Sequence, residues 1–278
     1  ATARGFGIYG LGCSTLSDRL DFWAGVRTTY DRREMTRFFT ADRSLGGTDN
    51  QFCIDFGGTP GGSSCGNLLI FADQRYDAVT WGAGLDFQVS DDVFTYLKVD
   101  KGFRAGGVNG RGSGAIFAAG GLTFDPEFLT MWETGVKADW LDNRLRTNLA
   151  IYTGRYTNVQ TTVFIPLGPT SITSRGNSGS ASVHGGELEV TALPLTGLQL
   201  RGGIGVSKFK WQTGPKTSKA GVSGTNRLGK TEERGTPELT ANFSARYTTP
   251  PVDLDNHGEL EFSFQVDWAY RSHQKGES

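Results

Sequence analysis

Hydrophobic and polar residues alternate along most of the chain, so that successive side chains fall on opposite sides of an extended segment. In residues 259–271 one side carries Leu260, Phe262, Phe264, Val266, Trp268 and Tyr270, and the other carries mostly polar residues. Residues 20–31, 78–89, 128–140, 145–160 and 238–248 follow the same rule. A period of two is typical of β-strands, so the pattern predicts strands rather than helices.

Ten such segments can be marked along the sequence. They lie near 5–15, 20–33, 76–89, 93–104, 128–140, 145–160, 181–193, 198–210, 238–249 and 259–271. Most are longer than the five or six residues usual in soluble proteins, whereas a tilted strand that crosses a bilayer needs about nine to eleven. The lengths therefore favour strands that cross a membrane.

The connections between these segments alternate between short and long. The short ones are 17–19, 90–92, 141–144, 194–197 and 250–258, and the long ones are 34–75, 105–127, 161–180 and 211–237. Short turns at one rim and long loops at the other are typical of outer-membrane barrels, in which the short turns are periplasmic. Trp132 and Trp140 share one side of a strand, about 20 Å apart along the membrane normal once the strand tilt is allowed for, as expected for the two aromatic girdles.

Composition agrees with this fold and excludes others. The chain has 40 Gly among 278 residues, 12% aromatic residues and only 9 Pro, which suits strands joined by glycine-containing turns. Its 28 basic and 29 acidic residues leave a net charge of -1, which argues against nucleic acid as a partner. No apolar run approaches the roughly 18 residues of a membrane helix. We therefore predict an all-β fold, part of a transmembrane antiparallel β-barrel.

Ten strands in this orientation leave both ends of the chain, Ala1 and 272–278, on the long-loop side. A bacterial barrel normally begins and ends on the periplasmic side, and an open sheet leaves unpaired N–H and C=O groups in lipid, at several kcal/mol each. We expect further strands outside this sequence.

Several segments resemble the barrel of TonB-dependent outer-membrane receptors, over nearly the whole chain. The similar stretches are 20–31, 89–107, 124–148, 176–191 and 237–247, and the most specific are KGFRAGG (101–107) and FDPE…WETGVKADWLDNRL (124–145). The resemblance implies that residues 1–278 are about ten strands of a 22-stranded barrel, without its plug domain, its first strands or its closing strands.

The same resemblance implies a function at the bacterial outer membrane. Such receptors sit in outer-membrane lipid and import scarce ligands, such as ferric siderophores or similar iron complexes. Their energy comes from the TonB complex, which they contact through an N-terminal region that is not found in this sequence. They are not enzymes, and the resemblance implies no cofactor.

Charged residues of the predicted strands gather on the side opposite the large apolar residues. They are Asp21, Arg27, Asp86, Lys98, Asp100, Arg104, Glu133, Lys137, Asp139, Arg146, Glu187, Glu189, Arg201, Arg246 and Asp267. Because Lys or Arg facing lipid near the midplane costs about 2–4 kcal/mol, these residues are expected to face the barrel interior. The ligand-binding candidates are Arg104, Lys98 and Asp100 of the interior and Lys216, Lys219 and Arg227 of a cationic loop.

The remaining motifs indicate little chemistry. Cys53 and Cys65 lie in one long loop, where an oxidising exterior permits a disulfide, and Cys13 is expected to be a small buried residue. The three histidines, His184, His257 and His273, lack the spacing of a metal site. The glycines of 5–10 spell GxGxxG but lack the following helix that a dinucleotide site requires.

Two other protein classes fit part of the pattern. One is a ten-stranded outer-membrane hydrolase, with Asp267 and His273 as candidate catalytic residues. The other is a soluble β-sandwich or propeller, in which a second layer would have to cover Phe262, Phe264 and Trp268.

Overall fold

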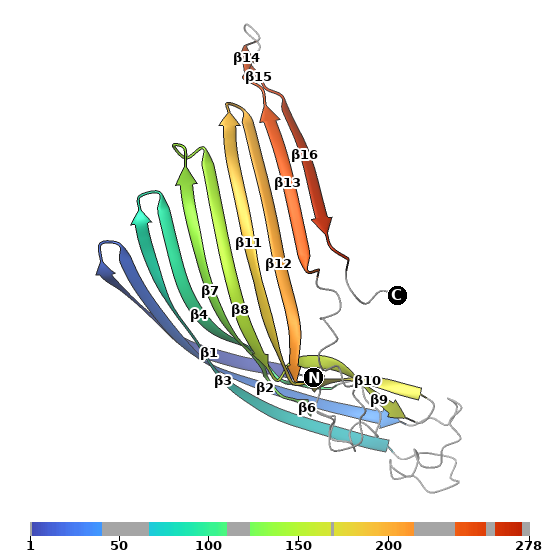
Figure 1. Ribbon diagram of the computed structural model, residues 1–278. Helices are drawn as coiled ribbons and strands as arrows, with labels where there is room; N and C mark the ends of the chain where they lie inside the picture. The colour runs from blue at the N-terminus through green and yellow to red at the C-terminus, as the bar shows by residue number, and fades with distance from the viewer. Residues whose placement is uncertain are drawn as a thin grey trace.

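The computed structural model describes residues 2–40, 67–109, 123–167, 170–213, 237–253 and 259–273. These residues form one ten-stranded antiparallel sheet in which the spatial order of the strands follows the sequence (Figure 1). The strands are β1 (Thr2–Ser17), β2 (Leu20–Thr40), β3 (Asn67–Ser90), β4 (Val93–Arg104), β7 (Glu127–Trp140), β8 (Leu145–Thr157), β11 (Ser180–Leu195), β12 (Leu198–Thr213), β13 (Leu239–Thr248) and β16 (Ser263–Arg271). The prediction of ten long antiparallel strands is confirmed.

Three pairs of shorter strands lie outside this sheet. They are β5 (Gly107–Val108) with β6 (Thr123–Phe124), β9 (Gln160–Leu167) with β10 (Thr170–Asn177), and β14 (Val252–Asp253) with β15 (Glu259–Leu260). The expectation of a loop over 161–180 is therefore wrong, because β9 and β10 pair as a hairpin over their full length. No helix that is long and apolar enough to cross a membrane occurs in these described ranges.

The last predicted strand, 259–271, is interrupted in the structure. Its first two residues pair with β14, and the sheet resumes only at Ser263. The neighbouring strand ends at Thr248, and Pro250 and Pro251 follow soon after it. Proline has no N–H to donate to a ladder, so regular pairing with 259–262 stops there.

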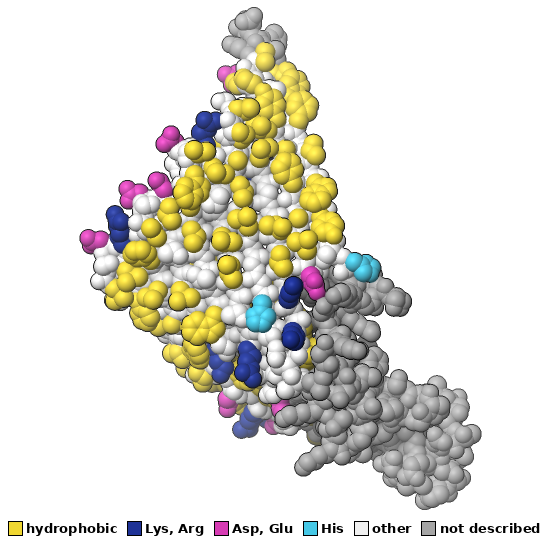
Figure 2. All heavy atoms as spheres, in the orientation of Figure 1, with side chains coloured by type: hydrophobic (Ala, Val, Ile, Leu, Met, Phe, Trp, Pro, Cys, Tyr) yellow, Lys and Arg dark blue, Asp and Glu magenta, His cyan; other side chains and the backbone are white. Residues whose placement is uncertain are grey.

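The register places the large apolar side chains on one side of the sheet, which we call the outer face. Trp132, Ile151 and Val266 on this face are 51%, 55% and 68% exposed. Figure 2 shows hydrophobic side chains in a broad band across the strands. None of the described segments covers this band, so the sandwich alternative, which requires a second layer, is wrong. An uncovered apolar band is what a barrel wall presents to lipid.

The opposite side, the inner face, carries the charged residues predicted to face the interior, together with aromatic side chains that lie on glycines. Trp23 lies over Gly84, where an added Cβ would stand 2.6 Å from its Cε2 atom, and Tyr96 lies over Gly135 in the same way. Aromatic side chains placed on glycines help to fix the register of neighbouring strands. Gly202 lies on the outer face, because it pairs with the outward-facing Val190 and Phe243.

Strand β1 forms one edge of the sheet, and this position changes the environment of its cysteine. Cys13 faces inward opposite Trp23, but it is exposed and unbonded. The expectation of a buried Cys13 is therefore wrong. An edge strand has a neighbour on one side only, so its inner side chains are covered less than those of a central strand.

Strands β2 and β3 extend beyond the apolar band at the long-loop end, so the loop between them is shorter than predicted. In this extension, at residues 31–36 and 71–78, the outer face becomes largely charged. Arg32 donates two hydrogen bonds to Asp73, at 2.9 and 2.7 Å, and pairs with Glu34 at 2.8 Å. The hydrogen bonds from Arg32 hold the pKa of Asp73 below its usual value. Paired charges of this kind suit a segment in water rather than in lipid.

Candidate functional site

A cavity of about 410 Å³ opens on the inner face at the long-loop end of the sheet. Its walls come from the outer ends of β1 and β2, from residues 104–108 and from β10. Three guanidinium-bearing residues line it, Arg33, Arg104 and Arg175, and they come from three different parts of the sequence.

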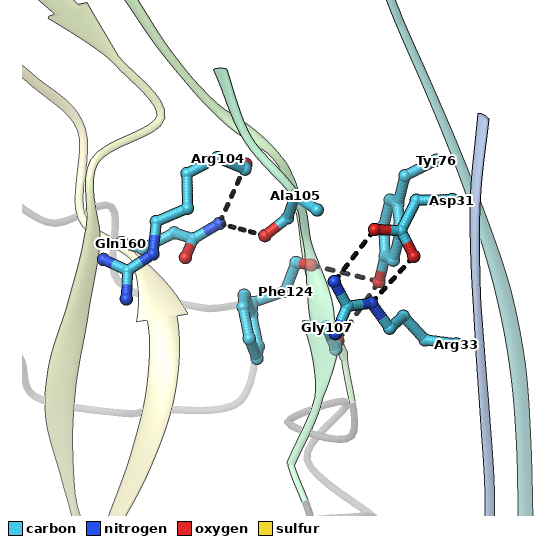
Figure 3. A network of polar contacts seen from close by, with 8 residues as sticks. All are labelled: Asp31, Arg33, Tyr76, Arg104, Ala105, Gly107, Phe124 and Gln160. Atoms are coloured by element: carbon cyan, nitrogen blue, oxygen red, sulfur yellow. Dashed lines mark hydrogen bonds and ion pairs between the residues drawn. The ribbon is translucent and has the colours of Figure 1, made fainter. Parts of the chain in front are cut away.

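Tyr76 anchors one wall of this cavity. Its buried hydroxyl lies 3.1 Å from the carbonyl oxygen of Gly107 and 3.2 Å from that of Phe124, and so reaches both strands of the β5–β6 pair (Figure 3). Burial raises the pKa of Tyr76, so the hydroxyl keeps its proton and remains a donor. The side chain thereby fastens the segment after Arg104 to the wall strand β3.

Gln160 anchors a second wall. Its side-chain nitrogen donates to the carbonyl oxygens of Ala105 at 2.9 Å and Asp125 at 3.0 Å, as Figure 3 shows for Ala105. Its backbone N–H donates to Glu127 Oε2 at 2.5 Å. Because Gln160 is 7% exposed, these hydrogen bonds are shielded from water and hold the segments on both sides of the β5–β6 pair.

Asn109 positions the third arginine. Its side-chain oxygen accepts a hydrogen bond from the backbone N–H of Arg175, and its side-chain nitrogen donates to the carbonyl oxygen of Arg175, both at 2.9 Å. Asn177 makes the same two-way contact with the backbone of Asp125, at 2.7 and 2.9 Å. The β9–β10 hairpin is therefore tied to the segments around the cavity by side-chain amides.

The arginines of the cavity differ in how far they are neutralised. Arg33 makes two hydrogen bonds of 2.8 Å to Asp31, which cancels most of its charge. Arg104 and Arg175 form no ion pair with any residue that the structure describes. Glu34 also lines the cavity, but its carboxylate is engaged by Arg32 at 2.8 Å. The cavity therefore favours an anion, because two of its cations are unpaired within the described part of the chain.

The residues predicted from the sequence as ligand contacts separate into three groups. Arg104 lines the cavity. Lys98 instead pairs with Glu133 at 3.1 Å, and Tyr96 donates to the same carboxylate at 2.7 Å. Asp100 lies over Gly82 in the barrel wall. Lys216, Lys219 and Arg227, together with Cys53, Cys65 and His257, lie outside the described residues.

The sequence reasoning missed Arg33 and Arg175. Arg33 could have been found by continuing the alternation of β2 two residues beyond Asp31, which places both side chains on the inner face. Arg175 has no such signal, because its position depends on the hairpin and on Asn109.

Neither metal nor catalytic chemistry is supported by the described residues. They contain no group of three or more His, Cys, Asp or Glu side chains that could hold a metal ion. His184 is instead hydrogen-bonded to Thr153, with Nδ1 2.7 Å from the hydroxyl oxygen. Asp267 and His273 are six residues apart on a largely extended segment, about 20 Å along the chain, too far for a shared proton.

A curved antiparallel sheet with an apolar outer face and a charged inner face is a segment of the wall of a membrane β-barrel. The chain belongs to the family described as TonB dependent receptor-like, beta-barrel, whose model matches residues 1–277. Members of this family are transport receptors, so the chain is not an enzyme, and the hydrolase alternative is wrong.

Solved structures with the same fold are distant in sequence. The siderophore receptor PiuA from Acinetobacter baumannii is 16% identical with a TM-score of 0.61, and the match covers 98% of this chain and 37% of that one. The ferric yersiniabactin uptake receptor FyuA from Yersinia pestis is also 16% identical, with a TM-score of 0.60 and coverage of 95% and 37%. The copper transporter OprC is 13% identical, with a TM-score of 0.52 and coverage of 88% and 32%. The matches thus span only about a third of the length of these proteins.

Proposed function

We propose that this chain forms part of the wall of a bacterial outer-membrane receptor that imports an anionic metal complex, most simply a ferric siderophore. The observation that carries the proposal is the cavity at the long-loop end, where Arg104 and Arg175 lack ion-pair partners among the described residues. In this proposal, residues 1–278 belong to a larger barrel of 22 strands that encloses a plug. A region N-terminal to this chain contacts TonB, which supplies the energy.

Two features support this choice of ligand. The chain shares its fold with PiuA, a siderophore receptor, and with FyuA, a ferric yersiniabactin uptake receptor. An unpaired guanidinium group donates up to five N–H bonds in a planar array that matches carboxylate, catecholate or phosphate oxygens. OprC, which has the same fold, is a copper transporter, so the experiment below compares several chelates.

The experiment compares uptake by the complete receptor that contains this chain and by its Arg104→Gln and Arg175→Gln variants. Labelled ferric complexes of hydroxamate, catecholate and carboxylate chelators are offered to iron-starved cells that lack other receptors. For the transported complex, we expect each substitution to weaken binding roughly tenfold to a hundredfold, because a charge-assisted hydrogen bond contributes about 1.5–3 kcal/mol. Removal of TonB should abolish uptake and leave surface binding unchanged.

The matched control is Arg201→Gln. Arg201 also faces inward but lies on β12 near the short-turn end, away from the cavity. If Arg104→Gln and Arg175→Gln bind and import the complex as well as this control does, the cavity is not the ligand site.

A further inference from the structure

The outer face carries a second group of basic side chains at the long-loop end, which we call the outer basic patch. Its members are Lys101, Arg155, His184, Lys208 and Lys210, from β4, β8, β11 and β12. All but Lys101 are exposed, and Figure 2 shows Lys, Arg and His side chains at this end of the hydrophobic band. The sequence pattern had indicated that charges avoid this face, and at this end of the sheet that expectation is wrong.

The register brings the patch together. Lys101 is opposite Thr130, Thr130 opposite Arg155, Arg155 opposite Ser182, and Ser182 opposite Lys210. Since neighbouring strands lie about 4.8 Å apart, successive cations of this row, Lys101, Arg155 and Lys210, are about 10 Å apart. His184 and Lys208 face each other in the next row toward the apolar band.

The strands that carry this patch place no acidic side chain on its face. The outer-face positions of β4, β7, β8, β11 and β12, as the register defines them, include no Asp or Glu. None of the five residues takes part in an ion pair with another described residue. The outer face of β2 and β3 is different, because there Arg32 is matched by Glu34 and Asp73. The patch therefore has a net positive charge that its own strands leave unbalanced.

The surroundings of the patch determine what can reach it. Trp132 of β7 lies on the same face in the row of His184 and Lys208, and Ile151, Leu188 and Val206 lie next to it toward the middle of the sheet; all four are exposed. A groove of about 540 Å³ lies among Thr130, Trp132, Arg155, Ser182, His184 and Gln212. It thus offers hydroxyl, amide and guanidinium donors directly above an apolar surface. A molecule that fills both regions has an acyl part below and an anionic, hydrogen-bond-accepting part above.

We propose that the outer basic patch binds the phosphate groups of lipid headgroups in the outer leaflet of the surrounding membrane. This inference rests on the outer-membrane location in the proposed function but not on the imported ligand. Cations of this kind, placed where acyl chains give way to headgroups, attract anionic lipid and hold the barrel at a fixed depth. The site proposed for soluble anions, the cavity lined by Arg104 and Arg175, lies on the opposite face of the sheet.

The test uses the complete receptor, purified in a neutral detergent and mixed with diphosphoryl lipid A or with lipid A from which both phosphates have been removed. Native mass spectrometry then counts the lipid that stays bound. The patch variant carries Arg155→Gln, Lys208→Gln and Lys210→Gln. The control carries Arg27→Gln, Lys137→Gln and Arg201→Gln, which remove the same charge from the inner face of the sheet.

We expect the patch variant to bind the phosphorylated lipid on the order of a hundredfold more weakly, since each Lys or Arg near an anionic surface contributes about fivefold. The control should bind it like the parent, and the dephosphorylated lipid should bind weakly to all three. The proposal would be overturned if the patch variant and the control retained equal amounts of lipid, or if the parent did not prefer the phosphorylated lipid. It would also be overturned if inorganic phosphate displaced the phosphorylated lipid from the parent. Transport assays on the same proteins report separately on the proposed function, so the two can fail independently.

Discussion

At the scale of single residues, the face on which a side chain lies determines what the position tolerates. In β16, Val266 faces outward and is 68% exposed, whereas Gln265 faces inward and donates hydrogen bonds to Asp267 at 2.9 and 3.0 Å. The alternation along the sequence predicted both placements, because the face on which one side chain of a strand lies fixes the face of the next. The expectation that charged residues avoid the outer face failed at Lys101 and Lys208, since a period of two does not show where the membrane ends.

Val266→Arg should impair assembly into the outer membrane more than Gln265→Arg does. An Arg on the lipid-facing side costs about 2–4 kcal/mol near the midplane, whereas an Arg on the inner face adds to a region that already holds charges. The yield of heat-modifiable folded protein in outer-membrane fractions measures this difference. Equal yields for the two variants would show that the facing of β16 is wrong.

Gly84→Ala should destabilise the barrel by about 1–3 kcal/mol, because the added Cβ would stand 2.6 Å from the ring of Trp23. Gly102→Ala is the control, since nothing lies within 4 Å of its added Cβ. The urea concentration at which the folded band disappears on a gel measures the effect. If Trp23→Ala does not restore tolerance of Gly84→Ala, the contact with Trp23 is not its cause.

At the scale of elements, the sequence predicted the central strands well and the segments beyond the membrane poorly. Strand β4, Val93–Arg104, has the predicted bounds, because lipid on one side and a polar interior on the other impose strict alternation. The hairpin of β9 and β10 lies outside the ten-stranded sheet and lacks that constraint. Arg175 is therefore placed by Asn109, a long-range contact that periodicity does not reveal.

Asn109→Ala should loosen the β9–β10 hairpin, because it removes both hydrogen bonds to the backbone of Arg175. We expect faster proteolysis within the hairpin and weaker binding of the anionic ligand, with the stability of the barrel unchanged. Limited trypsin digestion of the folded receptor measures the first effect. Thr95→Ala is a useful comparison, since Thr95 donates one hydrogen bond, to Gly135, within the wall. Identical digestion of both variants would contradict the role of Asn109.

The extension of β2 and β3 should lose protection in acid. The pKa of Asp73 is depressed in the folded state by the hydrogen bonds from Arg32, so its contribution to stability is present above the ordinary Asp pKa of about 3.9. It is lost as the pH falls through the depressed folded-state value. Amide protection factors in 31–36 and 71–78, followed against pH, measure this loss. In Asp73→Asn the acid-dependent step should be absent, and its persistence would assign the step to another group.

At the scale of the whole molecule, the two rims of the sheet are predicted to face different compartments. The short turns include residues 18–19, 91–92 and 141–144, and the long connections leave the opposite rim. In an outer-membrane barrel the short turns are periplasmic. This orientation follows from connection lengths alone, which explains why it could be predicted before the sheet was known.

Labelling with a maleimide that cannot cross membranes checks this orientation. In a complete receptor carrying Cys13→Ser, Asp142→Cys in a short turn should remain unlabelled on intact cells and become labelled after the outer membrane is permeabilised. Lys219→Cys, in a long loop, should be labelled in both states. Labelling of Asp142→Cys on intact cells would reverse the orientation, and with it the assignment of the arginine cavity to the outer surface.

Each strand of the ten-stranded sheet pairs only with the strands of that sheet that come directly before and after it along the chain. A connection at the rim can therefore be exchanged, lengthened or rebuilt while every pair of hydrogen-bonded strands keeps its partner. The strands and the connections are therefore constrained separately. Lipid constrains the strands, and in the proposed function the imported ligand constrains the connections. PiuA and FyuA share this fold with the chain at only 16% identity, so sequences that differ at most positions build the same sheet.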